Sequence, residues 1–231
     1  MAIRPVYVAR KDGGLSVVQK EVEFHWHPGM AKTQKQKSVA SLHAAAEKLG
    51  ISPILEISSK SEEQLGVALS AFNLTITTKV KKRTFSVECA FQGSKVFQRG
   101  GPYTDLFERT AREAKKDIRL KESGDLVGFR FFNKEFPLKP RTLFYDWIYI
   151  NALNQNEQLA DEVIRYSGFT DIEFNPSKSI NCQAFSAALF VSLCHSSLLR
   201  DALESPEAFA AVADEMYQKR EASYQIQSGL L

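Results

Sequence analysis

The chain has 231 residues, of which 44% are hydrophobic and 25% charged, and its formal net charge is +3. This length and apolar fraction suit one large globular domain or two small ones, and the small net charge excludes a histone-like polycation. Three cysteines without a CxxC pair argue against a secreted disulfide framework. Since no signal peptide or membrane-spanning run is evident either, we expect a cytoplasmic protein.

The first third of the chain predicts a hairpin over 3–9 and 16–24, a helix over 31–49, a strand over 53–58 and a short helix over 61–69. Apolar and polar residues alternate in the hairpin strands, and Gly50 suits the position just after a helix. Ser61 and Gln64 predict a capping box for the short helix.

A second hairpin is predicted over 74–78 and 84–87, and it leads into a helix that begins near Glu88 and ends before Gly100. Further helices are expected over 104–120, 141–153, 157–166, 184–199 and 206–219, with a loop over 171–183 and a fraying tail after Glu221. The pattern predicts a single α+β domain, mainly helical, with a small antiparallel sheet.

A helix that begins at Glu88 would carry Glu88, Gln92 and Lys95 on one polar face. At roughly 1.5 Å per residue, Glu88 and Lys95 would lie about 10 Å apart along the axis, a span that suits a nucleotide-sized ligand. Gly93 would let a ligand or another backbone approach closely. Periodicity alone favours the alternative of a solvated helix face.

The segment resembles the signature of the NADAR family of N-glycosidases, a Glu-x-x-aromatic-Gln-x-x-Lys string that follows a strand. Here it reads Glu88, Phe91, Gln92 and Lys95. The family's Leu-Ser-Asn-Phe turn is similar to 69–73 here, and its downstream basic run is similar to 111–119. The resemblance covers roughly 54–183, so it implies a NADAR-like core there, preceded by strands and a basic helix over 1–53 and followed by helices over 184–231.

One loop departs from the family pattern, because the usual Asp-x-x-Trp-Gly string is missing from 171–183. The strings over 24–29 and 174–183 resemble a divergent branch of the family, the antitoxins of DarTG-type toxin–antitoxin systems. That resemblance implies removal of ADP-ribose from guanine bases in DNA, with ADP-ribose as the product and a cognate DNA ADP-ribosyltransferase toxin as partner. It implies no cofactor. The alternatives are an N-glycosidase for a small riboflavin-pathway metabolite and a non-catalytic antitoxin that binds its toxin.

Cleavage of an N-glycosidic bond develops positive charge at the anomeric carbon, which a carboxylate stabilises. We expect Glu88 in this role, with Glu173 or Asp171 second. Lys95 is a candidate for capturing ring-opened ribose as a Schiff base, contacting a phosphate or orienting Glu88. The candidate substrate-binding residues are Ser70, Phe72, Asn73, Phe91, Gln92, Gly93, Arg112, Arg119, Trp147, Asn175, Lys178 and Asn181, and the candidate DNA-binding residues are Lys32, Lys35 and Lys37.

Two other motifs predict little chemistry. His25 and His27 have no third ligand at an obvious spacing, so no metal site is expected. Cys89 has no positioned histidine partner and is expected to be a buried structural thiol. For Trp147 a place in the core is the alternative to stacking on a base.

Overall fold

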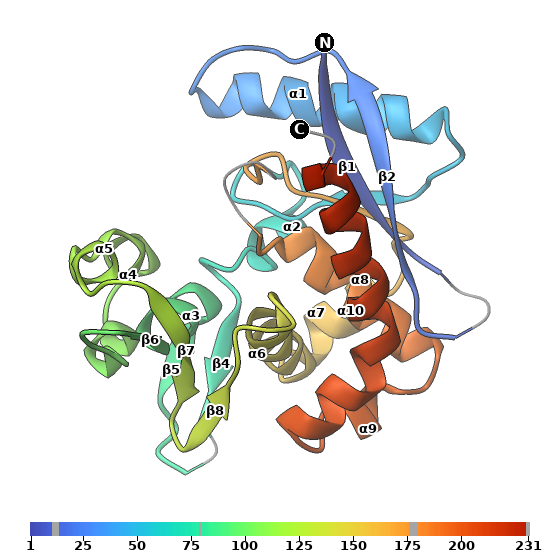
Figure 1. Ribbon diagram of the computed structural model, residues 1–231. Helices are drawn as coiled ribbons and strands as arrows, with labels where there is room; N and C mark the ends of the chain where they lie inside the picture. The colour runs from blue at the N-terminus through green and yellow to red at the C-terminus, as the bar shows by residue number, and fades with distance from the viewer. Residues whose placement is uncertain (11–13, 79, 176–179, 230–231) are drawn as a thin grey trace.

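A mixed sheet of four strands joins the N-terminal hairpin to the middle of the chain (Figure 1). The computed structural model describes residues 1–10, 14–78, 80–175 and 180–229, with the backbone alone for 223–229. The strand order is β2 (Val17–Phe24), β1 (Ala2–Ala9), β9 (Gly168–Thr170) and β3 (Ile54–Glu56). β1 is antiparallel to β2 and β9, whereas β3 is parallel to β9.

Helices cover both faces of this sheet. On one face, α1 (Lys32–Glu47) packs against β2, with Val6, Phe24 and Leu42 in a shared core. On the other face, α8 (Gln183–His195) packs against β1 and β9, and the Tyr7 and Phe185 rings meet edge to face at 5.6 Å. Because side chains alternate along a strand, neighbouring residues of β1 enter the two cores.

The second hairpin, β4 (Thr75–Thr77) and β5 (Thr84–Ser86), runs directly into α3 (Val87–Gly93). A sheet of β6 (Lys95–Phe97), β7 (Leu126–Phe131) and β8 (Lys134–Phe136) follows, all antiparallel. Between β6 and β7 lie the 3-10 helix η1 (Thr104–Glu108), α4 (Ala111–Lys116) and α5 (Arg119–Glu122). These elements form the green part at the left of Figure 1.

The buried helix α6 (Leu143–Asn154) joins the two parts, and nearly all its residues are apolar, as in a helix buried on every side. The Asp146 carboxylate on α6 accepts hydrogen bonds from Ser186 Oγ at 2.5 Å and Tyr217 OH at 2.9 Å. These bonds tie α6 to α8 and to α10 (Pro206–Gly229). The remaining helices are α2 (Gln64–Ala68), α7 (Glu157–Val163) and α9 (Leu199–Ala202).

Both predicted hairpins and the helices over 31–49, 141–153 and 184–199 are confirmed, as is the α+β class. The long helix from Glu88 was wrong, because α3 ends at Gly93 and Lys95 begins a strand that pairs with β7. The capping box was also wrong, since Ser61 Oγ accepts from Glu63 N and α2 has no side-chain cap. The helix α10 continues to Gly229, where a fraying tail was predicted after Glu221.

Gly93 faces the core, not a ligand. A Cβ at this position would lie 2.5 Å from Phe107 Cε1 and 3.1 Å from Tyr103 O. We expect Gly93→Ala to lower the free energy of unfolding by about 1–3 kcal/mol, as overpacking does in other cores. Urea denaturation measures this, and Phe107→Leu is the matched background because it opens the crowded space. An equal cost of Gly93→Ala in both backgrounds would contradict the contact.

Candidate active site

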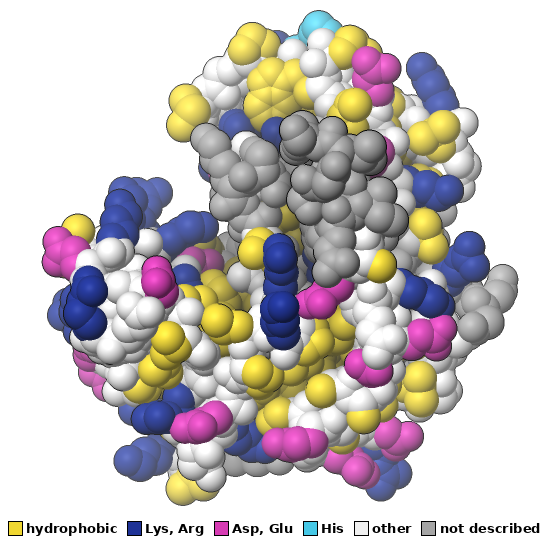
Figure 2. Space-filling model, viewed as in Figure 1, with side chains coloured by type: hydrophobic (Ala, Val, Ile, Leu, Met, Phe, Trp, Pro, Cys, Tyr) yellow, Lys and Arg dark blue, Asp and Glu magenta, His cyan; other side chains and the backbone are white. Residues whose placement is uncertain are grey.

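A cavity of about 820 Å³ lies where α3, β6 and α6 meet the loops after β3 and β9. Its volume falls in the range of small-molecule sites, roughly 300–1,000 Å³. Figure 2 shows the surface hollowed between the part that holds α4 and α5 and the part that holds the N-terminal hairpin. The cavity therefore has one wall from each of these parts of the fold.

The first wall is the start of α3. Ser86 Oγ caps the helix by accepting from Cys89 N at 3.2 Å, and Glu88 N donates to Ala71 O at 2.9 Å. These bonds fix the helix entry against the 70–74 turn, whose Ser70, Ala71 and Phe72 also line the cavity. Glu88 lies in the first turn, where the helix dipole favours a negative charge.

Glu88 is only 6% exposed and keeps few partners. Its Oε1 accepts from Gln92 Nε2 at 2.9 Å, and Lys115 Nζ lies 4.0 Å away. Gln92 Oε1 is buried and has no hydrogen-bond partner among the described residues, which leaves a polar atom for a ligand. The wall thus offers an anion and an unused amide oxygen to the cavity.

Lys95 lies at the start of β6, with Nζ 4.7 Å from the centre of the Phe91 ring. Burial lowers the pKa of Lys95, the Glu88 carboxylate opposes this shift, and the Lys115 ammonium adds to it. A lysine with a lowered pKa is more often a free amine, which is the form that attacks carbonyl groups. Glu88 and Lys95 therefore interact electrostatically, although Glu88 lies in α3 and Lys95 in β6.

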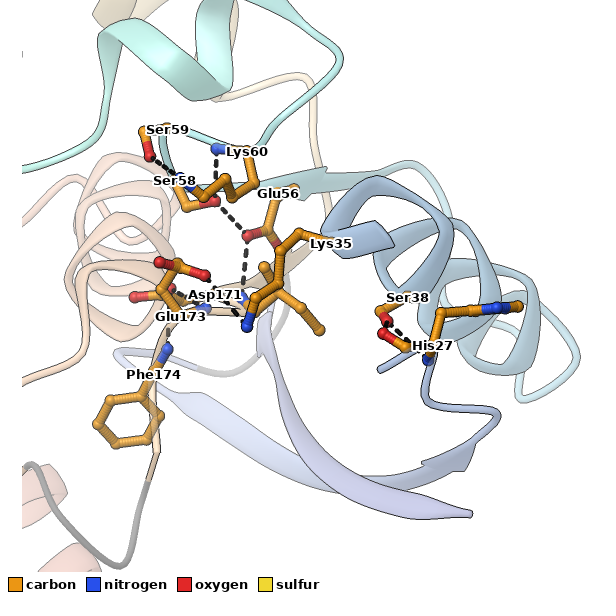
Figure 3. A network of polar contacts seen from close by, with 11 residues as sticks. His27, Lys35, Ser38, Glu56, Ser58, Ser59, Lys60, Asp171, Glu173 and Phe174 are labelled. Carbon is orange, nitrogen blue, oxygen red and sulfur yellow. Dashed lines mark hydrogen bonds and ion pairs between the residues drawn. The ribbon is translucent and has the colours of Figure 1, made fainter. Parts of the chain in front are cut away.

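The opposite wall is the segment after β9 (Figure 3). Asp171 Oδ1 accepts from Glu173 N at 3.0 Å and Phe174 N at 3.1 Å. Burial raises the pKa of Asp171 to about 8, and the neighbouring Glu56 carboxyl raises it as well. Gln183 fastens this wall to the first, because its Oε1 accepts from Ala71 N at 2.8 Å.

Nine of the predicted site residues line this cavity: Ser70, Phe72, Glu88, Phe91, Gln92, Lys95, Asp171, Glu173 and Asn181. Others lie elsewhere. Asn73 donates to Val67 O at 2.8 Å, and Arg112 is exposed on α4. Neither they nor Asn175 line the cavity, and Lys178 lies outside the described residues.

Two of the predicted substrate-binding residues, Arg119 and Trp147, instead make contacts within the protein. Arg119 NH2 pairs with Asp105 Oδ2 at 2.7 Å, and Arg119 Nε pairs with Asp117 Oδ1 at 2.8 Å. Trp147 packs in the core beside Phe136, with ring centres 5.1 Å apart. Both residues lie outside the cavity lining, so the core alternative for Trp147 is the one that the packing favours.

The lysines predicted to bind DNA differ in their surroundings. Lys32 and Lys37 are exposed on α1. Lys35 instead pairs with Glu173 Oε1 at 3.4 Å, and its Nζ lies 4.8 Å from the Trp26 ring centre. Lys35 therefore contacts Glu173, which lines the cavity.

Sequence reasoning missed several lining residues, namely Ser58, Ser59, Lys115, Lys139, Arg141, Tyr145 and Gln183. It also missed the carboxylate of Glu56 behind them. The available signals were two cations around Pro140 and an ionisable residue inside an apolar strand, Glu56. Neither signal tells which cavity the residues share.

Other candidate chemistry is weak. Within the described ranges, no group of three His, Cys, Asp or Glu side chains could hold a metal ion. Cys89 is buried, its Sγ donates to Arg109 O at 3.1 Å, and burial raises the pKa of its thiol, so the expected structural thiol is confirmed. No helix in the described part of the chain has both the length and the apolar character to cross a bilayer.

Comparison with known proteins identifies the family. The family model for the DarT1-associated NADAR antitoxins, NADAR-DarT1, matches residues 2–223. A search of the curated proteins gives no match. The family match extends on both sides of the 54–183 segment that carries the recognisable motifs, and it includes α1, α8 and most of α10. The chain therefore belongs to the family of DarT1-associated NADAR antitoxins.

Proposed function

We propose that the protein is an N-glycosidase that removes ADP-ribose from guanine bases in DNA and so reverses the action of a DarT-type toxin. The observation that carries the proposal is the buried Glu88 carboxylate beside Lys95 in a cavity of about 820 Å³. Membership of an antitoxin family supports the biological role and implies a cognate toxin.

The reaction requires a negative group at the anomeric carbon, where positive charge develops as the carbon–nitrogen bond breaks. Glu88 stabilises this charge and accepts a proton from the attacking water. Its low exposure strengthens the interaction, since few water molecules screen a buried charge. Lys95 either captures ring-opened ribose through its free amine or contacts a phosphate.

The remaining lining residues suit a nucleotide. Phe72, Phe91 and Tyr145 offer aromatic surface for a base or ribose. Lys115, Lys139 and Arg141 line the same cavity, and Lys139 and Arg141 form no ion pair with another described residue. Free cations of this kind bind the two phosphates of ADP-ribose.

Incubation with an oligonucleotide that carries ADP-ribosyl-guanine tests the proposal. Wild-type protein should release ADP-ribose and restore guanine. If wild-type protein releases none but still rescues cells from the toxin, a binding antitoxin is the correct function. Turnover of a riboflavin-pathway intermediate with none on the oligonucleotide would instead support the metabolite N-glycosidase.

Contact of α1 with DNA phosphates predicts a salt effect. Changing Lys32 and Lys37 together to Gln should weaken binding to unmodified duplex DNA, because each lost phosphate contact releases about one counterion fewer. The slope of log K against log salt, measured by fluorescence anisotropy, should fall in magnitude by about two. The same double change at Lys20 and Lys121, exposed lysines outside α1, is the control. An unchanged slope would remove α1 from the DNA-binding surface.

A further inference from the structure

Glu56 is a buried carboxylate to which the proposed function assigns no role. It is 2% exposed on β3, and Figure 3 shows its contact with Ser58. Both of its oxygens accept hydrogen bonds. Ser58 Oγ donates to Oε1 at 2.6 Å, as does Ile172 N at 2.9 Å, and Thr170 Oγ1 donates to Oε2 at 2.6 Å. Three donors suit an ionised carboxylate, which can only accept.

The second carboxyl group, Asp171, lies between two residues that bind Glu56. Thr170 and Ile172 both donate to Glu56, so the backbone holds Asp171 beside it. Asp171 is half-buried and lines the cavity, whereas Glu56 is closed off from solvent. Burial raises the pKa of Asp171, and the Glu56 carboxyl raises it further, because each of two neighbouring carboxyl groups in a buried site disfavours ionisation of the other. One of the two groups therefore keeps a proton. Burial raises the pKa of Glu56 as well, but its three donors oppose that shift. The effect of the Glu56 carboxyl on Asp171 assigns the proton to Asp171, although Asp171 also accepts from two backbone N–H groups.

The proton on Asp171 lies on the cavity wall opposite the Glu88 wall. Glu88, Asp171 and the Tyr145 phenol line the same cavity. N-glycosidic cleavage needs a donor at the leaving nitrogen, because an anionic base leaves poorly. One protonated and one ionised carboxyl group on facing walls match the acid and the base that such cleavage uses.

We propose that Glu56 is a positioning residue that keeps Asp171 protonated, and that Asp171 donates this proton to the guanine nitrogen as ADP-ribose departs. This inference rests on the proposed function. The carbon–nitrogen bond breaks with its electron pair going to nitrogen, which takes the Asp171 proton. Water adds to the anomeric carbon and loses a proton to Glu88. Solvent then returns a proton to Asp171, and Glu88 releases one.

The groups that face the pair are His43, Lys35, Glu173, Tyr145, Tyr149 and Cys182. Burial lowers the pKa of His43 to about 4, and its Nε2 lies 2.9 Å from Thr170 Oγ1, so this imidazole is neutral near pH 7. Burial raises the pKa of both tyrosines and of Cys182, which therefore stay protonated. Lys35 and Glu173 pair with one another. Near neutral pH, the groups on this wall whose charge changes are therefore the carboxyl groups of Glu56 and Asp171.

Two substrates separate proton donation from a structural role. One is the ADP-ribosyl-guanine oligonucleotide, and the other is ADP-ribose with 4-nitrophenolate at the anomeric carbon, a group that leaves without a proton. Asp171→Asn should lose roughly 10²–10⁴-fold in kcat on the oligonucleotide. On the nitrophenyl substrate the loss should be below about tenfold, because no proton is needed. Glu88→Gln, the control, should lose heavily on both.

Glu56→Gln tests the proposal independently, even if Asp171→Asn does not fold. Because Asp171 must be protonated, activity is present below its pKa and is lost as the pH rises through it. Removing the Glu56 charge lowers that pKa, so the alkaline limb of kcat should move to lower pH by about one unit. Glu56→Asp, which keeps the charge, should leave the limb within a few tenths of its wild-type position.

The outcomes distinguish this inference from the function on which it rests. Absence of wild-type turnover on the oligonucleotide overturns both. If wild-type protein is active, equal losses for Asp171→Asn on the two substrates overturn the role of Asp171 alone. An alkaline limb that Glu56→Gln leaves in place, or moves to higher pH, overturns the role of Glu56.

Discussion

Glu88→Gln is expected to lower the rate of ADP-ribose release from modified DNA by roughly 10³-fold. The amide keeps the size of the carboxylate, and its oxygen can still accept from Gln92 Nε2, so α3 retains its geometry. What is lost is the negative charge that, in the proposed mechanism, stabilises the anomeric carbon. Single-turnover kinetics on the modified oligonucleotide measure the loss, and calorimetry should find ADP-ribose affinity changed by less than about tenfold, since the charge acts mainly in the transition state.

Glu108→Gln is the matched control, because this carboxylate is exposed, pairs with Arg83 at 2.8 Å and lies outside the cavity lining. It should behave as wild type. Turnover by Glu88→Gln within about tenfold of wild type would remove Glu88 from the chemistry, since removing a general acid or base typically costs at least 10²-fold.

Lys95→Met is the change with the second-largest expected effect, a loss of roughly 10²-fold in kcat. Methionine keeps the apolar stem over the Phe91 ring but removes the amine beside Glu88. The rate of the modified oligonucleotide reaction again gives the measurement. Lys116→Met, which changes an exposed lysine on α4 that does not line the cavity, is the control.

Borohydride separates the two chemical roles of Lys95. A Schiff base between Lys95 and ring-opened ribose would be reduced to a stable adduct, which mass spectrometry finds on this residue. A phosphate contact gives no adduct. The two roles also differ in pH dependence. Because only the free amine is nucleophilic, the rate should rise as the pH rises through the lowered pKa of Lys95 if Lys95 forms a Schiff base. Wild-type turnover by Lys95→Met would contradict both roles.

The start of α3 could be predicted from sequence because its signals are local. The β4–β5 hairpin leads directly into α3, and Glu88 and Gln92 are about one helical turn apart. The length of the helix could not be predicted, because Lys95, Val96 and Phe97 become a strand only by pairing with β7, about thirty residues later. Strands of three residues depend on such tertiary pairing more than on propensity.

The cavity wall after β9 could not be predicted from sequence for a similar reason. Glu56 and Thr170 are 114 positions apart, and they meet because β3 and β9 pair in parallel. Asp171 and Glu173 were predicted as second-choice acids, yet nothing local tells that a buried carboxyl group lies behind Asp171. The role of Trp147 depends in the same way on packing, which places it against Phe136.

Hydrolysis of the modified oligonucleotide in water labelled with oxygen-18 tests the central claim most directly. The account predicts that one labelled oxygen enters ADP-ribose at the anomeric carbon while the oligonucleotide regains unmodified guanine without label. The unlabelled guanine reports which bond breaks, because water that attacked the base would leave its oxygen there, whereas the anomeric hydroxyl of ADP-ribose also exchanges with water after release. Loss of the whole guanine to leave an abasic site, or recovery of the modified oligonucleotide unchanged, would contradict the account.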